Sequence, residues 1–199
     1  MPDKEPLRTY RSKRDVAASG EPSADEPRRR GAPMFVFQRH DASSLHFDFR
    51  LEVDGVLVSW AVPKGPSTDP RDKRLATRTE DHPLAYADFE GVIPDGQYGA
   101  GTVVVWDTGS YRNITERDGH PVPMGEAVEA GHVKVWLAGR KVTGAFALTR
   151  TKMRGDERNW LLVKMDDAGA DRRRKPATSQ LESVLSGRTN DELADGHDA

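Results

Sequence analysis

The sequence predicts a mainly β protein, built as an antiparallel β-barrel or sandwich with few short helices. Short runs rich in Val, Thr, Phe and Trp follow one another between residues 34 and 165. Turn signals that contain glycine separate these runs, and stretches with a helical period are rare and short. Many closely spaced strands joined by such turns are typical of an all-β barrel or sandwich.

Length and composition restrict the class of protein further. The 199 residues are enough for one domain with a buried core. The absence of cysteine excludes disulfide bonds and thiolate metal sites. A formal net charge of −2 argues against a protein that coats DNA non-specifically. Because neither a membrane-length apolar run nor a signal peptide is evident, we expect a cytoplasmic protein with no membrane partner.

The chain divides into three parts by composition. Residues 1–33 are polar and rich in Pro, Arg and Glu, so we expect a mobile N-terminal arm, with the arginines 28–30 in a solvated linker. Residues 34–166 carry the β runs and form the predicted barrel domain. Residues 167–199 are polar and charged, so we expect a C-terminal tail that is disordered or loosely packed, with an amphipathic turn at Gln180–Leu185.

Local patterns place the first strands and their turns. Met34–Phe37 is an apolar run, and Leu45–Val53 alternates strictly between apolar and polar residues, which is the period of a strand. Asp54-Gly55 is a tight-turn signal, so Val56–Val62 should return antiparallel. Proline cannot donate to a β ladder, so Pro63 should end this strand.

The rest of the barrel is predicted from similar signals. A turn is expected at Gly109, and a short helix within residues 121–129. The glycine-rich segment 91–101 lacks the Gly-Lys-Ser/Thr ending of a nucleotide-binding loop, so we interpret it as structural. The further β runs are Arg74–Thr79, Thr102–Asp107, Tyr111–Thr115, His132–Leu137, Val142–Arg150 and Trp160–Met165.

The polar face of the strand at Leu45–Val53 is unusual. It carries His46, Asp48 and Arg50 in a row, and the short turn at residues 41–44 can bring His40 back beside His46. Such a face is usually the solvated side of a sheet. Two imidazoles and one carboxylate can also converge on a divalent ion, and this ligand set suits Mn²⁺ or Zn²⁺ better than Mg²⁺ or Ca²⁺, which prefer oxygen ligands.

Several long motifs in a fixed order resemble those of one known family. From about Leu7 to Lys164 the chain is similar to the 3′-phosphoesterase domain attached to bacterial ATP-dependent DNA ligases of the D type, which also occurs as a free-standing protein. The matching motifs are His-Asp-Ala-x-x-Leu-His-Phe-Asp-Phe-Arg-Leu-Glu (40–52), Ser-Trp-Ala-Val-Pro-Lys-Gly-Pro (59–66), Lys-Arg-Leu-Ala (73–76), Glu-Asp-His-Pro-Leu-x-Tyr-x-Asp-Phe-Glu-Gly (80–91) and Ile-Pro-x-Gly-x-Tyr-Gly-Ala-Gly-Thr-Val (93–103).

The resemblance implies a fold, a cofactor and roles for individual residues. The family fold is a small antiparallel β-barrel with a concave polar active-site face, and the favoured ion is Mn²⁺, with Zn²⁺ or Co²⁺ as other transition metals. The family places Lys64 and Arg74 around the scissile phosphate and His82 on the reacting phosphate, with Tyr86 close by. In the N-terminal segment, the residues that would help to build the site are Arg14, Asp15 and Glu21.

Chemistry assigns the other roles. Hydrolysis of a phosphate ester requires neutralised oxygens, an activated water and a stabilised leaving group, which a divalent ion and cationic donors can supply. Arg50 can grip phosphate oxygens with its planar guanidinium, and His82 can hydrogen-bond a non-bridging oxygen. Candidates for ordering these groups or contacting metal-bound water are Glu80, Asp15 and Glu21.

The resemblance also implies a substrate and partners. The substrate would be the 3′ end of a DNA primer strand that carries a terminal ribonucleotide or a 3′-phosphate, and the product a 3′-OH in double-strand break repair. No Lys-x-Asp-Gly nucleotidyl-transfer motif is present, so the chain is not predicted to be a ligase. We expect a monomer that works alone or beside separate ligase, polymerase or end-binding repair proteins.

Two other classes of function remain open from the residues. An iron(II)-dependent oxygenase on a β-barrel also uses two histidines and one carboxylate. The cations Arg50, Lys64, Arg74 and His82 around the predicted site favour a phosphate over a small organic acid. A non-catalytic nucleic-acid-binding module would require exposed aromatic residues interleaved with cations, whereas the aromatic residues here lie mostly at positions expected in the core.

Overall fold

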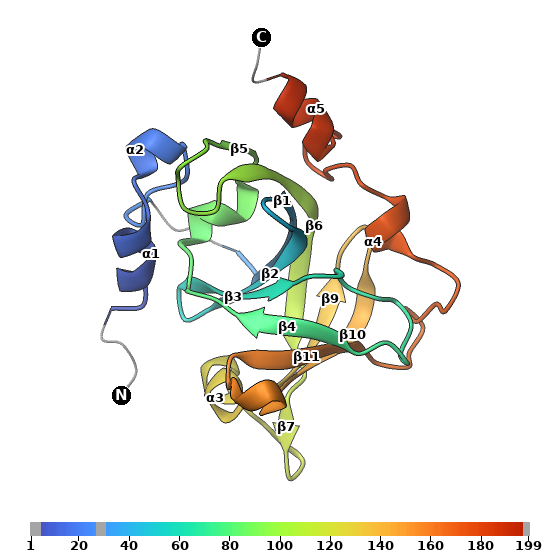
Figure 1. The fold of residues 1–199 in the computed structure, drawn as a ribbon. Coiled ribbons are helices and arrows are strands. Elements are labelled where there is room, and N and C mark those ends of the chain that lie inside the picture. The colour runs from blue at the N-terminus through green and yellow to red at the C-terminus, as the bar shows by residue number, and fades with distance from the viewer. Residues whose placement is uncertain (1–4, 27–30, 197–199) are drawn as a thin grey trace.

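Eight antiparallel strands close into a barrel in the computed structural model, which describes residues 5–26 and 31–196 (Figure 1). Strand β5 (Gly91–Ile93) pairs with one end of β6 outside this ring. Pairing between β1 and β6 completes the closure. The order around the barrel is β1 (Met34–Asp41), β2 (Leu45–Val53), β3 (Val56–Val62), β4 (Arg74–Arg78), β11 (Asn159–Lys164), β10 (Thr143–Arg150), β9 (His132–Ala138) and β6 (Gly101–Asn113).

The hairpin predicted at Asp54-Gly55 is confirmed. Val53 pairs with Val56, and the two residues between them have positive φ angles of 48° and 86°. A two-residue turn of this type requires left-handed conformations at both positions, which Asp tolerates and Gly adopts freely. Strand β3 then ends at Val62, immediately before Pro63, as predicted.

The turn predicted at Gly109 is wrong. Strand β6 runs from Gly101 to Asn113 without interruption, and Gly109 lies within it. A side chain at this position would collide with the carbonyl oxygen of Ala138 on the neighbouring strand. The glycine therefore allows a close approach of two backbones, which is a second common use of glycine in strands.

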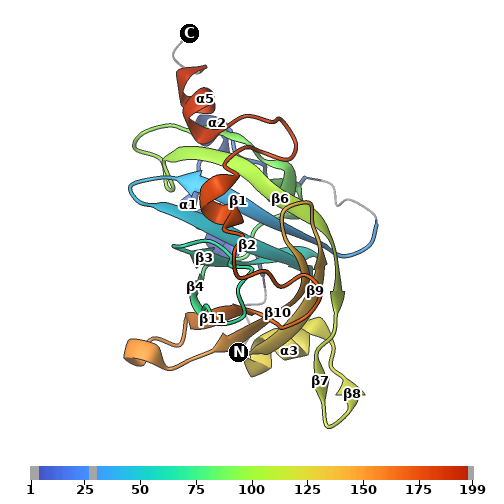
Figure 2. The same cartoon turned by 90° about the vertical axis from the view of Figure 1, so that its right-hand side faces the viewer.

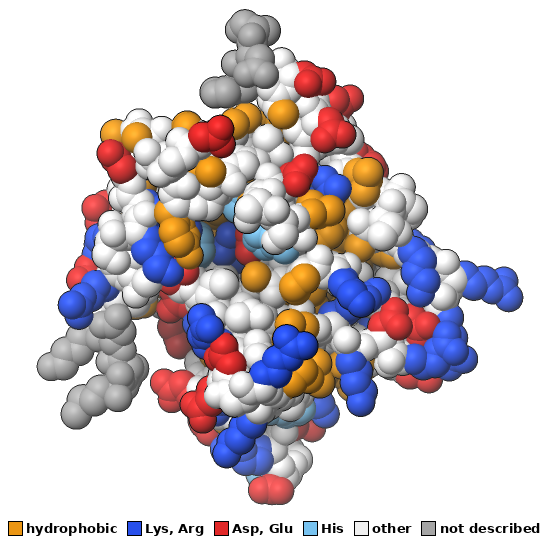
Figure 3. Space-filling model, in the orientation of Figure 1, with side chains coloured by type: hydrophobic (Ala, Val, Ile, Leu, Met, Phe, Trp, Pro, Cys, Tyr) orange, Lys and Arg blue, Asp and Glu red, His pale blue; other side chains and the backbone are white. Residues whose placement is uncertain are grey.

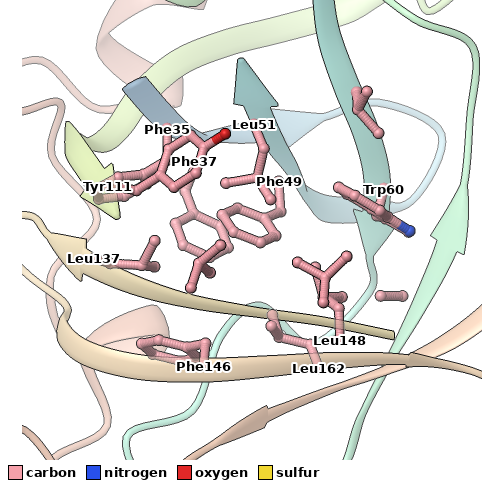
Figure 4. Packing of buried hydrophobic residues seen from close by; sticks show 14 of the residues in the cluster. Phe35, Phe37, Phe49, Leu51, Trp60, Tyr111, Leu137, Phe146, Leu148 and Leu162 are labelled. Atoms are coloured by element: carbon pink, nitrogen blue, oxygen red, sulfur yellow. The ribbon is translucent and has the colours of Figure 1, made fainter. Parts of the chain in front are cut away.

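The inner face of the barrel holds the main hydrophobic core. The apolar residues of β2, including Phe47, Phe49 and Leu51, are almost fully buried there. Phe37 and Phe49 stack with ring centroids 4.3 Å apart, and Figure 4 shows both pointing into the space enclosed by the strands, towards Phe146 on the opposite wall. Burial of each such side chain contributes roughly 1.5–3 kcal/mol, so this face fixes the strand register.

The outer face of β1, β2 and β3 is covered by a second layer. Two short helices, α1 (Arg8–Lys13) and α2 (Val16–Ser19), and the 3-10 helix η1 (Leu84–Asp88) lie on this side of the barrel (Figure 1). A smaller hydrophobic cluster joins this layer to the strands, and it consists of Tyr10, Val36, Leu57, Leu84, Tyr86, Ala87 and Val105. The polar residues of β2 therefore face this layer and not the barrel interior.

The C-terminal segment packs more closely than its composition predicts. Ser183 and Asn190 are 3% and 1% exposed, and the Val184 amide donates to the Val105 carbonyl. No helix forms at Gln180–Leu185; the short helices of this segment are α4 (Pro176–Ser179) and α5 (Asn190–Asp195). Hydrogen bonds from buried polar groups to β6 anchor the segment, and composition does not reveal such contacts.

The remaining elements lie around the barrel. Helix α3 (Met124–Ala130) falls largely within the predicted range, and the 3-10 turn η2 (Met153–Gly155) joins β10 to β11. Strands β7 (Glu116–Arg117) and β8 (His120–Pro121) form a small hairpin that projects from the end of the molecule opposite α5 (Figure 2).

None of the helices in the described ranges has the length and apolar character that a membrane crossing requires. The arginines 28–30, which the sequence assigns to a solvated linker, lie outside the described residues.

Candidate active site

The register of β1 and β2 brings the predicted ligands together. His40 and His46 are directly paired across the hairpin, and Asp48 lies two residues further along the same outward face. One ligand atom from each of the three side chains lies within 4.8 Å of the other two. The turn at residues 42–44 is thus short enough to make a compact donor set from two neighbouring strands.

Backbone carbonyls fix which nitrogen each imidazole turns inward. The Nε2 of His40 lies 2.8 Å from the Gly99 carbonyl oxygen, and the Nδ1 of His46 lies 3.0 Å from the Ser44 carbonyl oxygen. A carbonyl can only accept, so these nitrogens carry the protons of neutral rings. The opposite nitrogens lie 3.5 Å and 3.6 Å from Asp48 Oδ2. Metal-binding histidines use this arrangement, and the donor set fits Mn²⁺ or Zn²⁺.

The charges of the cluster stabilise an ionised Asp48. Burial acts to raise its pKa, but the charge of Arg50 and the contacts with both histidines hold the pKa well below its usual value. Burial acts to lower the pKa of His46, but the hydrogen bond and charge of Asp48 outweigh it, and the pKa is raised above 6.5. A cation bound between these groups would replace that imidazolium proton.

Arg50 is the centre of the polar network on this face. Its side chain is buried, and it donates from Nε to Gln38 Oε1 at 2.8 Å and from Nη1 to Ser59 Oγ at 2.9 Å. Its Nη2 lies 3.4 Å from Asp48 Oδ2. Because three of its nitrogens contact protein groups, Arg50 orients its neighbours in addition to presenting positive charge to the cavity.

His82 lies between two arginines. A pair of backbone hydrogen bonds with Leu57 of β3 holds the residue in place. Its Nδ1 is 3.0 Å from Arg50 Nη1, and its Nε2 is 3.1 Å from Arg14 Nη2. Burial lowers its pKa well below 6.5, and both guanidinium charges lower it further. The ring is therefore neutral at pH 7. Its Nδ1 also lies 2.9 Å from the Glu80 carbonyl oxygen and carries the proton, while Nε2 accepts from Arg14.

Arg14 reaches this network from the N-terminal segment. Its Nε donates to Glu21 Oε1 at 3.0 Å and its Nη1 donates to Glu80 Oε1 at 2.8 Å. The guanidinium also lies over the ring of Tyr10, 4.4 Å from the centroid. Burial acts to raise the pKa of Glu80, but the Arg14 contact outweighs it and the net shift is downward. Two carboxylates thus hold one guanidinium at the cavity wall.

Glu21 and Tyr86 close the wall on the same side. The Tyr86 hydroxyl donates to Glu21 Oε1 at 2.8 Å, while Glu21 Oε2 is buried and has no hydrogen-bond partner within the described residues. Burial raises the pKa of Tyr86 well above its usual value, so the hydroxyl keeps its proton. The free carboxylate oxygen is a spare acceptor beside the cavity.

These side chains surround one cavity of about 300 Å³. Histidine and basic side chains are visible at the hollow near the centre of Figure 3. The lining joins the candidate ligands to the arginine and carboxylate network, and its chemically functional members are His40, His46, Asp48, Arg50, Arg14, His82, Glu80, Glu21, Tyr86 and Tyr98.

Three predicted site residues are not part of this lining. Asp15 is exposed, and its carboxylate caps helix α2 by accepting from the Ala18 amide. Lys64 is exposed on the loop after β3. Arg74 lies at the start of β4, with its Nη2 3.4 Å from Asp72 Oδ2. The structure therefore separates Asp15, Lys64 and Arg74 from the groups that surround the cavity.

Sequence reasoning missed four contributors. Gln38 is fully buried, donates to the Tyr86 and Phe89 carbonyls and accepts from Arg50. It shares the outward face of β1 with His40, so the two-residue period could have identified it. The others are Ser59, Tyr98 and the carbonyl of Gly99, which lie within the motifs at 59–66 and 93–103 but were assigned no role.

Comparison with known proteins identifies the family. The family model described as "DNA Ligase D 3'-phosphoesterase domain" matches residues 38–150. The chain belongs to this family. It is 50% identical over 172 residues to the multifunctional non-homologous end joining protein LigD of Pseudomonas aeruginosa, which covers 85% of this chain and 20% of that protein.

Two further LigD relatives have similar coverage. The protein of Mycolicibacterium smegmatis is 46% identical over 163 residues, with 81% of this chain and 21% of the relative covered. The LigD protein of Mycobacterium tuberculosis is 46% identical over 160 residues, with 80% of this chain and 20% of the relative covered. This LigD phosphoesterase-family chain therefore spans about a fifth of the length of the relatives it matches.

Proposed function

We propose that the protein is a metal-dependent DNA 3′-end phosphoesterase that acts in non-homologous end joining. It removes a 3′-terminal ribonucleoside as a phosphodiesterase and then the remaining 3′-phosphate as a phosphomonoesterase, which leaves a 3′-OH. One observation carries this proposal above all. The donor set of His40, His46 and Asp48 faces the same cavity as the Arg14–His82–Arg50 row, so ion and phosphate sites are adjacent.

The metal half of the site is formed by His40, His46 and Asp48. They would hold Mn²⁺, with Zn²⁺ or Co²⁺ as other ions that fit two nitrogens and one carboxylate. A bound ion of this type supplies charge neutralisation for the phosphate and lowers the pKa of a coordinated water. The Gly99 and Ser44 carbonyls support this role because they hold the proton of each neutral ring on the outward nitrogen, which leaves the inward nitrogen with a free lone pair.

The phosphate half is formed by Arg14, Arg50 and His82. Two guanidinium groups around a neutral, buried imidazole would offer N–H donors to phosphate oxygens. Their charges are already paired with the carboxylates of Glu21, Glu80 and Asp48, so the bound ion would supply the extra positive charge that a phosphate needs. The one N–H of the neutral His82 ring, on Nδ1, faces the Glu80 carbonyl oxygen at 2.9 Å, so His82 would donate to a non-bridging oxygen once this proton lies on Nε2. Since charge on these oxygens changes during hydrolysis, donors fixed in advance stabilise the transition state.

The remaining residues position these groups. Glu80 and Glu21 hold Arg14, and Tyr86 holds Glu21, so these three act on the reaction through Arg14. Asp15 acts one step further away, because it caps the helix that follows Arg14. Lys64, outside the cavity lining, would contact the DNA strand at a distance from the reacting phosphate. Arg74 would act in the same way.

The chemistry around the donor set also bears on the alternatives. An iron(II) oxygenase has no need for two buried arginines beside its ligands, and a passive binding module has no need for the ligands. By analogy with the LigD relatives, whose names describe multifunctional end-joining proteins, we propose that this chain supplies one step beside separate ligase, polymerase and end-binding proteins. We propose that it does so as a monomer.

A 3′-end processing assay on a primer–template tests the function directly. A labelled DNA primer with one 3′-ribonucleotide, annealed to a longer template, is incubated with protein and Mn²⁺, and products with 3′-phosphate and 3′-OH ends are resolved on a denaturing gel. We expect the 3′-phosphate product first and the 3′-OH product later. A wild-type protein that leaves both the ribonucleotide and a 3′-phosphate primer intact, with metal bound, would contradict the proposal.

A further inference from the structure

Two segments distant in the sequence meet beside the candidate active site. The loop between β3 and β4 contacts the segment that precedes α4: the Asp171 amide donates to the Thr68 carbonyl at 2.8 Å. The Thr68 hydroxyl bridges to the carbonyls of Asp171 and Arg174, at 2.7 Å and 3.0 Å. Thr68 is 1% exposed, so this junction is a fixed part of the fold.

The joined segments form a strongly basic surface, which we call the basic platform. Residues 64–74 and 171–175 contain eight Lys and Arg side chains and three Asp side chains, an excess of five positive charges, in a protein whose net charge is −2. Asp166 at its rim reduces this excess by one. The cations of the platform are Lys64, Arg71, Lys73, Arg74, Arg172, Arg173, Arg174 and Lys175.

Internal ion pairs leave much of this charge free. Arg71 pairs with Asp69 at 2.8 Å, while Arg74 and Lys175 share Asp72 at 3.4 Å and 3.8 Å. The exposed cations Lys64, Lys73, Arg172 and Arg173 have no ion-pair partner within the described part of the chain. Exposed, unpaired cations on a rigid support are suited to bind a polyanion.

The platform begins where the cavity ends. Ala61 of β3 lines the cavity, and Lys64 follows three residues later, which is at most about 11 Å along the chain. In Figure 3 basic side chains gather on the right of the central hollow, where Figure 1 places the loop after β3 and the segment before α4. With a rise of about 3.4 Å per nucleotide in duplex DNA, this distance corresponds to roughly three nucleotides.

We propose that the basic platform binds the phosphate backbone of the DNA duplex whose 3′ end enters the cavity, from about three nucleotides inward. This inference rests on the proposed function. Residues 64–74 and 171–175 contain no aromatic side chain, so stacking on unpaired bases is not available and contact with phosphates is favoured. The cations at 172–175 lie beyond the range 38–150 that the family model matches. They add contacts with the phosphate backbone outside that range.

Charge removal on the platform tests the inference. The variant Lys73→Gln/Arg172→Gln/Arg173→Gln changes three exposed cations that lie outside the catalytic cavity. The matched control is Arg112→Gln/Arg117→Gln/Lys152→Gln, which changes three exposed cations elsewhere on the protein. The two variants lose the same number of positive charges, so an effect of net charge alone would appear equally in both.

Three measurements are made on each protein. Affinity for a fluorescent duplex with a recessed 3′ end is measured by anisotropy at several salt concentrations, and affinity for polyglutamate is measured in parallel. Turnover of bis(p-nitrophenyl) phosphate with Mn²⁺ reports on the cavity alone. We expect the platform variant to bind the duplex about tenfold more weakly. Its plot of log K against log salt concentration should be less steep, with a slope less negative by about 2–3. The control variant and the small-substrate turnover should be unchanged.

The outcomes separate this inference from the proposed function. Equal salt slopes in platform variant, control and wild type would overturn the platform, even if 3′-end hydrolysis is found. Loss of polyglutamate binding with unchanged duplex binding would also overturn it and assign the surface to an acidic protein partner. If wild type hydrolyses no 3′ end but the platform variant alone loses duplex affinity, the proposed function fails while the platform stands.

Discussion

His40 and His46 are cross-strand partners, and their ring centroids lie 4.7 Å apart. Each ring uses one nitrogen for a backbone carbonyl and turns the other towards Asp48. A shift of the hairpin by one residue would move every side chain to the opposite face of its strand. The core-facing phenylalanines of β2 thus determine the geometry of the donor set as well as the stability of the barrel.

His46→Ala should abolish Mn²⁺ binding and hydrolysis of both 3′-end substrates, because it removes one of the two nitrogen donors. Isothermal titration calorimetry on chelator-treated protein measures the first effect and the primer assay the second. His132→Ala, at an exposed position of β9, is the control and should behave as wild type. Wild-type activity of His46→Ala after chelation and Mn²⁺ addition would disprove the ligand assignment.

Arg50→Lys and His82→Ala should leave the ion bound but slow hydrolysis. Loss of a fixed donor to the phosphate should cost about 2–4 kcal/mol in the transition state, which is roughly a hundred- to thousandfold in rate. Lysine keeps the positive charge beside Asp48 but cannot contact Gln38, Ser59 and a phosphate with one planar group.

For each of these two variants, Mn²⁺ affinity and the single-turnover rate of hydrolysis are measured and compared with wild type. Thermal unfolding checks that each variant is folded. Loss of metal together with loss of rate in His82→Ala would make His82 a ligand. Unchanged rates in both variants would assign them no part in the reaction.

Mn²⁺ affinity should fall with falling pH, and the fall should begin above pH 6.5. The contact with Asp48 raises the pKa of His46 in spite of its burial, so a proton competes with the ion at a higher pH than for a free imidazole. Calorimetric titrations across pH 5.5–8.5, repeated in buffers with different ionisation heats, measure both affinity and proton release. Tighter binding at pH 5.5 than at 7.5 would contradict the expectation.

The stability of the metal-free protein should decrease as the pH falls below 6.5. Burial and two arginines depress the pKa of His82, so in this range the unfolded chain takes up a proton that the folded protein rejects. The raised pKa of His46 acts in a separate window: its contribution is complete below 6.5 and is lost at higher pH.

Urea unfolding in the presence of a chelator measures this pH dependence. His82→Asn should flatten the curve of unfolding free energy between about pH 6.5 and 5, because the titrating group is gone. A wild-type slope that persists unchanged in the variant would assign it to another group.

Gly101→Ala should be far more destabilising than Gly96→Ala. Both glycines have positive φ, 138° and 84°, but a Cβ at Gly101 would collide with the Asp41 carbonyl oxygen, whereas a Cβ at Gly96 would meet nothing within 4 Å. We expect losses of about 3 kcal/mol or more and about 1 kcal/mol respectively, measured by urea unfolding. Equal losses would show that the β1–β6 contact beside His40 relaxes at little cost.

Local patterns in the sequence predicted the parts of the site that lie close together along the chain. The two-residue period and one short turn were enough to place His40, His46 and Asp48 together, because a hairpin has few possible registers. The same reasoning could not place Arg14 against Glu80, since nothing in either neighbourhood specifies a partner 66 residues away.

Glycine and polar residues were the least predictable positions. Gly109 has the local signature of a turn, yet it serves the contact between β6 and β9. Asn190 lies in a segment whose composition suggests loose packing, but its amide donates to the Arg39 and Thr102 carbonyls. In each case a neighbour distant in sequence decides the role of the residue.

The metal-ligand residues lie close together in the sequence, whereas the residues of the phosphate site lie far apart, and this difference has a consequence for folding. The candidate ligands lie within residues 40–48, whereas the Arg14–Glu80 pair closes a loop of 66 residues. The chain entropy lost on closing the longer loop is greater by roughly 2 kcal/mol. The ion site should therefore assemble before the phosphate site, and partial unfolding should release the substrate before it releases the metal.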